Sequence, residues 1–172
     1  MRNRIVAVCV LLAALSGCQS APPPVRHEPP PPSPAELRAQ ALDSLGFDRS
    51  EQGWLLRLPD PIWFDFNKAS INADMQHNLE GIADDLIKAK IRSLRIEGHT
   101  DNTGPRDYNV ELSRKRAEAV AQTFIAHGFE DAKIERVAYG PDRPVAPNDT
   151  RDGRALNRRV EIIVPTKAVE EP

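Results

Sequence analysis

Two long stretches of the chain carry apolar residues at the three-to-four-residue spacing of an amphipathic helix. They are residues 71–90 and residues 107–127, and Gly128 supplies a stop after the second. A shorter helix is predicted over residues 34–46, where apolar residues fall four apart and Ser33 can cap the first turn. We therefore expect three helices, of which two are long enough to cover a sheet.

Short apolar or alternating runs between these helices predict strands. Prolines separate the first two runs, which form either a hairpin or one bent edge. Residues 140–156 are polar and contain several Gly and Pro, so we expect a long loop there, and the charged tail after residue 165 is expected to fray. The predicted strands are residues 54–58, 62–67, 94–98, 133–139 and 159–164.

The order of these elements predicts the fold class. After the first short helix the order is β-α-β-α-β-β. Strand–helix–strand connections of this length favour parallel neighbouring strands with right-handed crossovers. The last strand follows a loop without a long helix, so it should run antiparallel to a neighbour. We therefore expect an α/β (α+β) domain, in which a mixed sheet carries its helices packed on one face.

The beginning of the chain has a different pattern. Arg2 and Arg4 precede eleven uncharged apolar residues, Ile5 to Leu15. Eleven helical residues span roughly 16 Å, which is too short for a hydrocarbon core of about 30 Å. The pattern therefore predicts a secretory signal peptide rather than a membrane-spanning helix.

The end of this segment, Leu15-Ser16-Gly17-Cys18, resembles the lipobox of bacterial lipoproteins. That resemblance implies removal of residues 1–17 and lipidation of Cys18, and two or more acyl chains hold a protein stably on a membrane. Gln19, which is not aspartate, implies sorting to the outer membrane. The alternative is a plain signal peptide with an incidental cysteine.

Composition adds a linker and excludes one class of partner. Of the 172 residues 16 are proline, and eight of these lie in residues 22–34. Residues 18–34 therefore form a lipidated, Pro-rich linker, which could span up to about 50 Å if fully extended. Residues 35–60 follow as an N-terminal extension with no assigned role. The formal net charge is −2, and without a basic excess we expect no nucleic-acid partner.

The densest polar cluster lies where the predicted strand at 94–98 leads into the second long helix. Backbone N–H groups at a helix N-terminus suit an anion. Asn109 and Arg116 are two helical turns apart and share a face. The planar guanidinium of Arg116 matches the geometry of a carboxylate, and Asp101 on the preceding loop can accept a hydrogen bond from an ammonium. Together they suit a zwitterionic amino-acid end. The alternative is that Asp101 closes an Asx-turn and Arg116 is a solvated helix residue.

Residues 63–164 as a whole resemble the OmpA-like C-terminal domain that is found in OmpA, in the peptidoglycan-associated lipoprotein Pal and in the MotB stator. The joint pattern is highly specific. With the lipobox and the proline linker, Pal-like outer-membrane lipoproteins have the nearest architecture. The matching pieces are Phe64-Asp65-Phe66-Asn67, Gly98-His99-Thr100-Asp101-Asn102-Thr103-Gly104, Tyr108-Asn109, Leu112-Ser113, Arg116-Ala117, Gly140, Gly153-Arg154 and Asn157-Arg158-Arg159-Val160-Glu161.

This resemblance implies noncovalent binding of peptidoglycan through the diaminopimelate of its stem peptide. By position, Asp101 would hold the ligand's ammonium and Arg116 its carboxylate, while Asn67, Thr103 and Asn109 would line the pocket. The protein would be lipid-anchored in the outer membrane, would face the periplasm and would tether the membrane to the cell wall. Tol-system or other envelope proteins are candidate protein partners.

The resemblance also implies boundaries and structural roles. Residues 61–165 would form the OmpA-like domain, and residues 166–172 a tail. Asn157, Arg158 and Arg159 are expected to be structural, with both arginines paired to acids and the asparagine ordering the loop.

Other kinds of site are disfavoured. His99 and Asp101 are too few for a metal site, and Cys18 would be lipidated, so we expect no metal and no cofactor. Asp101 and Asp107 could act as the acid and base of a glycan hydrolase, but Asp107 at a helix N-terminus stabilises the helix dipole without chemistry. We therefore expect a binding module with no catalytic residues rather than an enzyme.

Two other functions differ in how well the sequence supports them. A MotB-like stator would need a membrane-spanning helix at the N-terminus, which the short apolar run does not supply. A lipoprotein that binds a periplasmic protein through the same face stays open.

Overall fold

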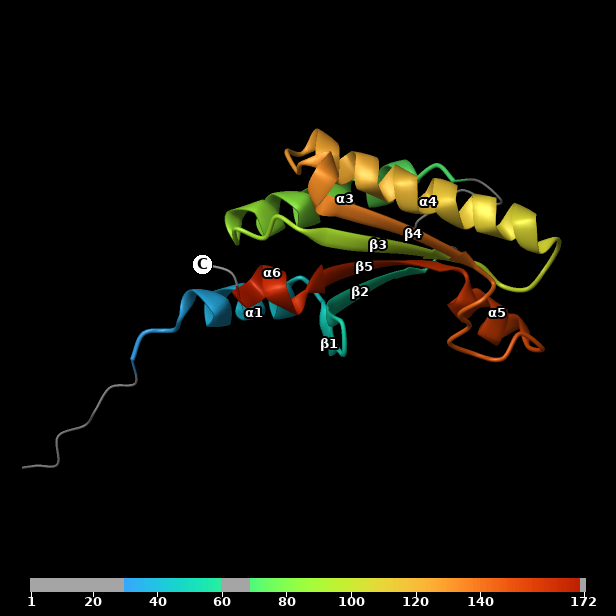
Figure 1. Cartoon of the computed structure of the whole chain (residues 1–172), viewed down its shortest axis with the longest axis horizontal. Helices are drawn as coiled ribbons and strands as arrows, with labels where there is room; N and C mark the ends of the chain where they lie inside the picture. Colours follow the sequence, from blue (N-terminus) through green and yellow to red (C-terminus); the bar gives the residue numbers. More distant parts are fainter. Residues whose placement is uncertain (1–29, 60–68, 171–172) are drawn as a thin grey trace, which may run out of the picture. The chain divides into compact units, whose positions relative to one another are not determined.

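A five-stranded mixed sheet forms the centre of the part of the chain that the computed structural model describes, residues 30–59 and 69–170 (Figure 1). Nearly all of these residues belong to one compact unit, Pro32–Pro172. In spatial order the strands are β1 (Asp48–Ser50), β2 (Gly53–Pro59), β5 (Arg159–Pro165), β3 (Leu94–His99) and β4 (Ile134–Gly140). β3 and β4 are parallel, and the other neighbouring pairs are antiparallel.

The last strand of the sheet lies in its middle. β5 pairs with β2 on one side and with β3 on the other, in both cases antiparallel. β2 and β3 are consequently parallel to each other without being neighbours, so the expectation of parallel neighbours is wrong for this pair, because β5 inserts between them. The expected β-α-β-α-β-β order, mixed sheet and antiparallel last strand are confirmed, and the parallel pair predicted around a helical crossover is β3–β4.

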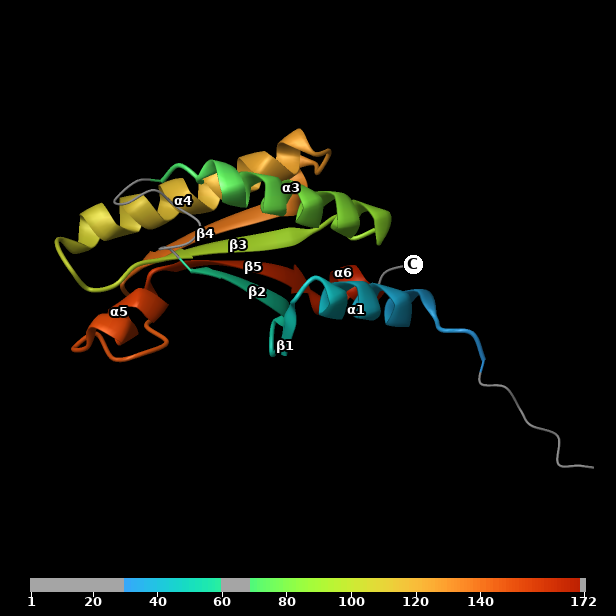
Figure 2. The same cartoon turned by 180° about the vertical axis from the view of Figure 1, so that it is seen from behind.

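Two long helices, α3 (Ala73–Lys88) and α4 (Arg106–Ala126), cover one face of the sheet (Figures 1 and 2). Asn72 begins α3, because its side-chain oxygen accepts from the backbone N–H of Met75 at 2.9 Å. Apolar side chains of both helices pack against the central strands and exclude water from the core. The buried set includes Leu79, Ala83 and Leu86 of α3, Ala117, Val120, Ala121 and Phe124 of α4, and Ile96, Val160, Ile162 and Val164 of the sheet.

Two short helices lie in segments that were expected to be irregular. α5 (Arg151–Asn157) interrupts the predicted loop at 140–156, and α6 (Thr166–Glu170) occupies the tail that was expected to fray. Thr150 caps α5 by accepting from the N–H of Gly153 at 3.0 Å, and Val169 of α6 is buried. Both predictions are therefore wrong. A cap and a buried contact stabilise helices that are too short to show an apolar period.

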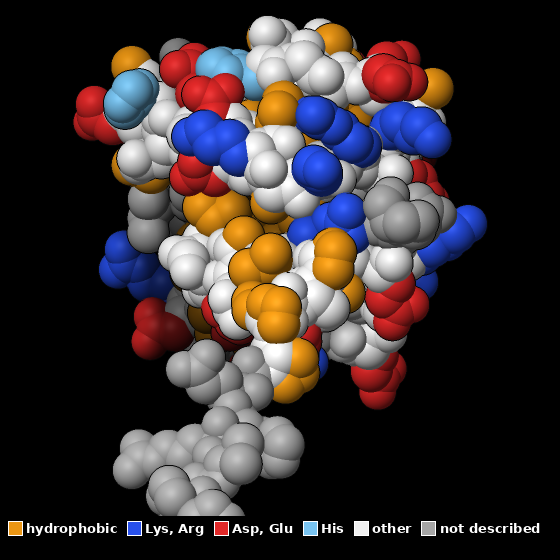
Figure 3. Space-filling model, turned by 90° about the vertical axis from the view of Figure 1, so that its left-hand side faces the viewer, with side chains coloured by type: hydrophobic (Ala, Val, Ile, Leu, Met, Phe, Trp, Pro, Cys, Tyr) orange, Lys and Arg blue, Asp and Glu red, His pale blue; other side chains and the backbone are white. Residues whose placement is uncertain are grey.

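The predicted helix at 34–46 is α1 (Pro34–Ser44), which packs against α6 and α3. Ser33 and Glu36 form a capping box, with each side chain accepting from the other's backbone N–H. Arg38 donates from Nη1 to the carbonyl oxygen of Val169 at 3.0 Å and so joins α1 to α6. At this end of the molecule, hydrophobic side chains lie among charged ones on the surface (Figure 3).

Some predictions fall outside the described residues. The strand predicted at 62–67 is one of them, and with it the choice between a hairpin and a bent edge. Asn67 and Cys18 are two more. Among the helices that the structure describes, none is both long enough and apolar enough to cross a membrane.

Candidate ligand-binding site

The loop that joins β3 to α4 begins with a buried carboxylate. Asp101 is 7% exposed, and its two oxygens have different partners. Oδ1 accepts from the backbone N–H of Thr103 at 2.9 Å, which closes the Asx-turn that was expected as the alternative. Oδ2 accepts from Nη1 of Arg158 at 2.7 Å. Asp101 therefore shapes its loop and also pairs with a cation beside the start of β5.

The Asp101 carboxyl is held in its charged form. Burial acts to raise its pKa, but hydrogen bonds from the Thr103 N–H and the Arg158 guanidinium outweigh burial and bring the pKa below the usual value for aspartate. Because water is largely excluded, this negative charge acts on a nearby cation more strongly than a surface charge would. The loop thus presents a fixed negative charge at neutral pH.

The first turn of α4 is tied to the same loop. Asn109 is 4% exposed, and its Nδ2 donates to the carbonyl oxygen of Thr103 at 2.9 Å. The side chain of Thr103 is itself exposed. Three of the predicted site residues, Asp101, Thr103 and Asn109, are therefore joined directly by hydrogen bonds.

Arg116 lies two helical turns beyond Asn109 on α4 and is 2% exposed. The alternative in which Arg116 is a solvated helix residue is therefore wrong. An arginine side chain keeps its proton in proteins, and a buried ion is costly unless other groups compensate it. Because positions seven apart share a helix face, α4 presents this buried cation on the side that carries Asn109.

Two glycines allow α4 to lie this close to the sheet. A Cβ on Gly98 of β3 would sit 2.1 Å from the carbonyl oxygen of Ser113, and a Cβ on Gly140, where φ is +52°, would sit 3.0 Å from the backbone nitrogen of Val110. The Ser113 hydroxyl accepts from the N–H of Gly140 at 3.1 Å and donates to the carbonyl oxygen of Val110 at 2.8 Å. These contacts set the height of α4 above β3 and β4.

Asn157 orders the neighbouring loop, as the sequence predicted. Its Oδ1 accepts from the backbone N–H groups of Val145 at 2.8 Å and Ala146 at 3.0 Å. Its Nδ2 donates to the carbonyl oxygen of Ala146 at 2.7 Å and to Oδ1 of Asn148 at 2.9 Å. The expected structural role of Asn157 is confirmed.

The two arginines that follow pair with acids, which confirms the expectation for both. Arg159 pairs with Glu161 at 2.8 Å, and Arg158 pairs with Asp101. The sequence did not indicate which acid each arginine takes. Arg158 therefore belongs to the candidate site, although the sequence did not place it there. The only feature of the sequence that pointed to Arg158 was its position in the Asn157-Arg158-Arg159 run.

The fold and this site define the class of protein. It is an α/β domain of β-α-β-α-β-β order with an acid buried in the loop between β3 and α4 and an arginine buried on α4 itself. The chain belongs to the OmpA family, whose family model matches residues 63–158.

Similar proteins support this membership. The chain is 39% identical over 167 residues to the outer-membrane lipoprotein YfiB of Pseudomonas aeruginosa, across 96% of this chain and 95% of that protein. It is 30% identical over 158 residues to the peptidoglycan-associated lipoprotein of Mesorhizobium japonicum, across 92% of this chain and 89% of that protein. The solved periplasmic domain of Helicobacter pylori MotB aligns with a TM-score of 0.62 and 32% identity, across 72% of this chain and 83% of that domain.

These matches confirm the predicted OmpA-like resemblance and the predicted fold class. The similarity to lipoproteins extends over nearly the whole chain, so the predicted outer-membrane lipoprotein class and location are confirmed as well. The expectation of a binding module rather than an enzyme is confirmed by the same family membership.

Proposed function

We propose that this protein binds peptidoglycan noncovalently, through the diaminopimelate of the stem peptide, and so tethers the outer membrane to the cell wall. The observations that support the proposal are two buried opposite charges, Asp101 in the loop between β3 and α4 and Arg116 on the face of α4 that carries Asn109. The free end of a diaminopimelate side chain is an ammonium beside a carboxylate. Such a ligand needs one local acid and one local base.

Asp101 is suited to the ammonium. A carboxylate offers about four lone-pair positions, and here two partners, the Thr103 N–H and the Arg158 guanidinium, are in place. A ligand ammonium would use a remaining lone pair or would compete with Arg158. The lowered pKa keeps the carboxylate charged throughout the neutral range.

Arg116 is suited to the carboxylate. Its planar guanidinium can donate two parallel hydrogen bonds to one carboxylate, a geometry that a lysine ammonium lacks. Its burial on α4 strengthens such a bond, because little water competes. Asn67, Thr103 and Asn109 would complete the pocket, with the Asn109–Thr103 hydrogen bond holding the loop against the helix.

The tethering role rests on the N-terminal segment. Lipidation of Cys18 would anchor the chain, and residues 18–34 would carry the domain up to about 50 Å from the membrane. The name of the Mesorhizobium relative, peptidoglycan-associated lipoprotein, supports the same role.

Sedimentation with purified sacculi tests this function. Residues 19–172 keep all of the compact unit and are the form to assay. We expect binding by the unaltered chain, and a loss of about 1.5–3 kcal/mol, or roughly 10–150-fold in affinity, for Asp101→Asn and for Arg116→Gln. Asp107→Asn and Arg114→Gln alter exposed charges of the same helix and should bind normally.

Three results would contradict the proposal. Unchanged sedimentation of both site variants would overturn the assignment of the site. Release of soluble muropeptides from the sacculi would show an enzyme instead. No binding to sacculi, together with capture of a periplasmic protein that depends on Asp101, would favour the protein-interaction alternative.

A further inference from the structure

A second group of ionisable side chains lies on the sheet face opposite α3 and α4. Glu97 of β3 and Glu161 of β5 are directly opposed in the antiparallel register, and their neighbours Ile96 and Ile162 point into the core. His99 follows Glu97 by two residues and so projects to the same side. Glu97, His99 and Glu161 are 2%, 1% and 7% exposed. Two buried carboxylates placed opposite each other repel, so this arrangement requires positive charge nearby.

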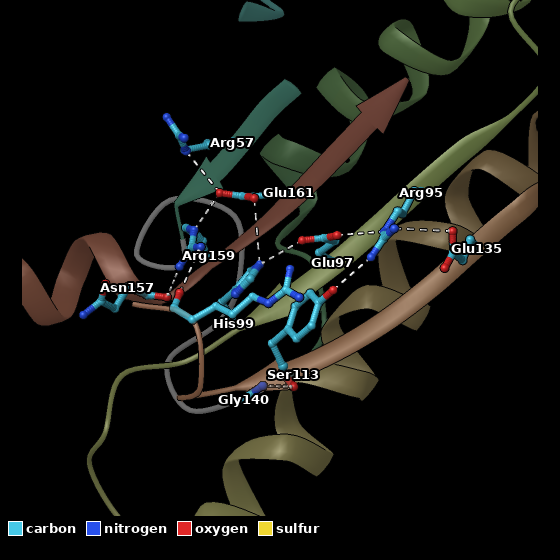
Figure 4. A network of polar contacts seen from close by, with 12 residues as sticks. Arg57, Arg95, Glu97, His99, Ser113, Glu135, Gly140, Asn157, Arg159 and Glu161 are labelled. Atoms are coloured by element: carbon cyan, nitrogen blue, oxygen red, sulfur yellow. Dashed lines mark hydrogen bonds and ion pairs between the residues drawn. The ribbon is translucent and has the colours of Figure 1, made fainter. Parts of the chain in front are cut away.

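Arginines pair with one oxygen of each carboxylate (Figure 4). Oε1 of Glu97 pairs with Nε of Arg95 at 2.7 Å. Oε1 of Glu161 pairs with Nε of Arg159 at 2.8 Å and with Nε of Arg57 at 3.1 Å. The arginines therefore hold both carboxylates in fixed orientations and leave Oε2 of each to face elsewhere.

Both remaining oxygens face the same nitrogen. Nε2 of His99 is 3.6 Å from Oε2 of Glu97 and 3.9 Å from Oε2 of Glu161, and these separations are too long for hydrogen bonds. Among the described residues, neither ring nitrogen of His99 has a hydrogen-bond partner. A buried imidazole thus points into the space between two carboxylate oxygens without bonding to either.

A protonated His99 bridging the two acids does not account for this geometry. Burial, and after it the charge of Arg159, lowers the pKa of His99 to about 4, despite the opposing effect of Glu161. Both separations between His99 and the carboxylates are also longer than charge-assisted hydrogen bonds, and a neutral imidazole can offer a nitrogen lone pair to an ion.

We propose that Oε2 of Glu97, Nε2 of His99 and Oε2 of Glu161 form a binding site for a divalent transition-metal ion of the zinc type. Each of the three residues offers one ligand atom, and these atoms lie within 4.8 Å of one another. Tetrahedral zinc holds nitrogen and oxygen ligands at about 2.0–2.2 Å, so its ligands are roughly 3.4 Å apart. Small side-chain movements would bring all three atoms to that spacing.

The surroundings fit a zinc site better than a calcium or magnesium site. A neutral imidazole suits zinc, whereas Ca²⁺ and Mg²⁺ favour sets of oxygen ligands. Arg57, Arg95 and Arg159 would serve as the outer groups that orient the ligating carboxylates. All three ligand residues line a cavity of about 350 Å³, which gives the ion a path of entry and leaves room for water as a fourth ligand.

A bound ion would join β3 to β5 on the sheet face opposite α3 and α4. It would also offer one exchangeable coordination position toward the cavity, where a donor group of another molecule could replace water. The proposal is independent of peptidoglycan binding, because it uses none of the residues assigned to diaminopimelate.

Zinc titration of metal-free residues 19–172 tests the site. We expect one Zn²⁺ per chain by calorimetry and by elemental analysis after gel filtration. Glu97→Gln, Glu161→Gln and His99→Phe should each weaken binding by at least about 10–100-fold, since even outer groups of metal sites contribute that much. His127 is the matched control, because it lies in another histidine–carboxylate group, 3.0 Å from Asp84, and His127→Ala should bind normally.

The possible results are distinguishable. Absence of stoichiometric zinc binding by the unaltered chain would overturn the proposal, as would unchanged binding in both glutamine variants or loss of binding in His127→Ala. Circular dichroism checks that each variant is folded. Should His99→Phe unfold, the two glutamine variants, which keep side-chain shape, decide the matter. Nitrogen NMR of the unaltered chain gives a second test, because zinc should shift the ring nitrogens of His99 and leave those of His127 unchanged.

Discussion

Replacing Gly98 with alanine tests whether the close packing of α4 on β3 positions the binding site. The new Cβ would lie 2.1 Å from the carbonyl oxygen of Ser113 and 2.7 Å from its carbonyl carbon. Both are backbone atoms in the middle of a long helix, so no side-chain rotation relieves the contact. Ordinary van der Waals contact begins at 3.4 Å, and α4 must therefore move away from β3 by more than about 1 Å, a shift that counts as overpacking.

The expected cost follows from these contacts. Overpacking a core typically costs about 1–3 kcal/mol, and a clash with backbone belongs at the upper end of that range. The shift also stretches the hydrogen bond between Ser113 and Gly140, worth about 1 kcal/mol. We expect Gly98→Ala to lose about 3–4 kcal/mol of unfolding free energy. The control is Gly81→Ala in α3, where a Cβ meets nothing within 4 Å. This variant should gain about 0.5–1 kcal/mol of unfolding free energy.

Urea unfolding followed by circular dichroism measures both variants, and sacculus sedimentation measures binding. Gly98→Ala should also bind sacculi more weakly, because the shift of α4 carries Asn109 and Arg116 with it. An unfolding midpoint equal to that of the unaltered chain would refute the packing argument. A clear loss of stability with unchanged binding would show that the height of α4 does not determine the site.

Three further predictions concern other parts of the chain. In the metal-free protein the pKa of His99 is lowered from 6.5 to about 4. As pH falls, His99 therefore takes up a proton in the unfolded chain before it does so in the folded chain. Up to about 3 kcal/mol of stability should therefore be lost between pH 6.5 and 4, and His99→Phe should remove this loss from the pH dependence of the urea midpoint; an unchanged pH slope would contradict it. Asn157→Ala removes four hydrogen bonds and should cost about 2–4 kcal/mol in the same unfolding assay, whereas a loss below about 0.5 kcal/mol would rule out its role in ordering the loop. Cys18→Ser should abolish labelling of the chain by radioactive palmitate, and labelling that persists would remove the lipoprotein anchor.

Residues with a clear period were the predictable part of the fold. The helices α3 and α4 were predicted because burial on one face imposes a spacing that can be read along the chain, and the strands β3, β4 and β5 because apolar and polar residues alternate along them. α5 was missed because the cap of Thr150 and the four hydrogen bonds of Asn157 are polar contacts, which leave no apolar period in the sequence. α6 was missed because the burial of Val169 depends on α1, which lies far away in sequence.

The residues proposed to bind diaminopimelate and those proposed to bind zinc also differ in how far the sequence could predict them. The spacing of seven residues placed Asn109 and Arg116 on one face of α4, whereas their grouping with Asp101 as a site came from the resemblance to OmpA-like domains and stays a prediction. Glu97 and Glu161 come together only through the register between β3 and β5. His99 and Asp101 alone are too few for a metal site, and nothing along the chain indicates that Glu161 lies opposite Glu97.

The union of α1 with α6 has a mechanical consequence. α1, which receives the linker, lies at one end of the sheet, and the loop between β3 and α4 lies at the other (Figures 1 and 2). Under the proposed tethering role, a force that drew the membrane and the wall apart would therefore run along the strands, from α1 through β2 and β5 to β3. Hydrogen bonds between antiparallel strands stand across that direction and share the load together, rather than opening one after another. A domain loaded in this way extends only when many hydrogen bonds between strands break at the same time.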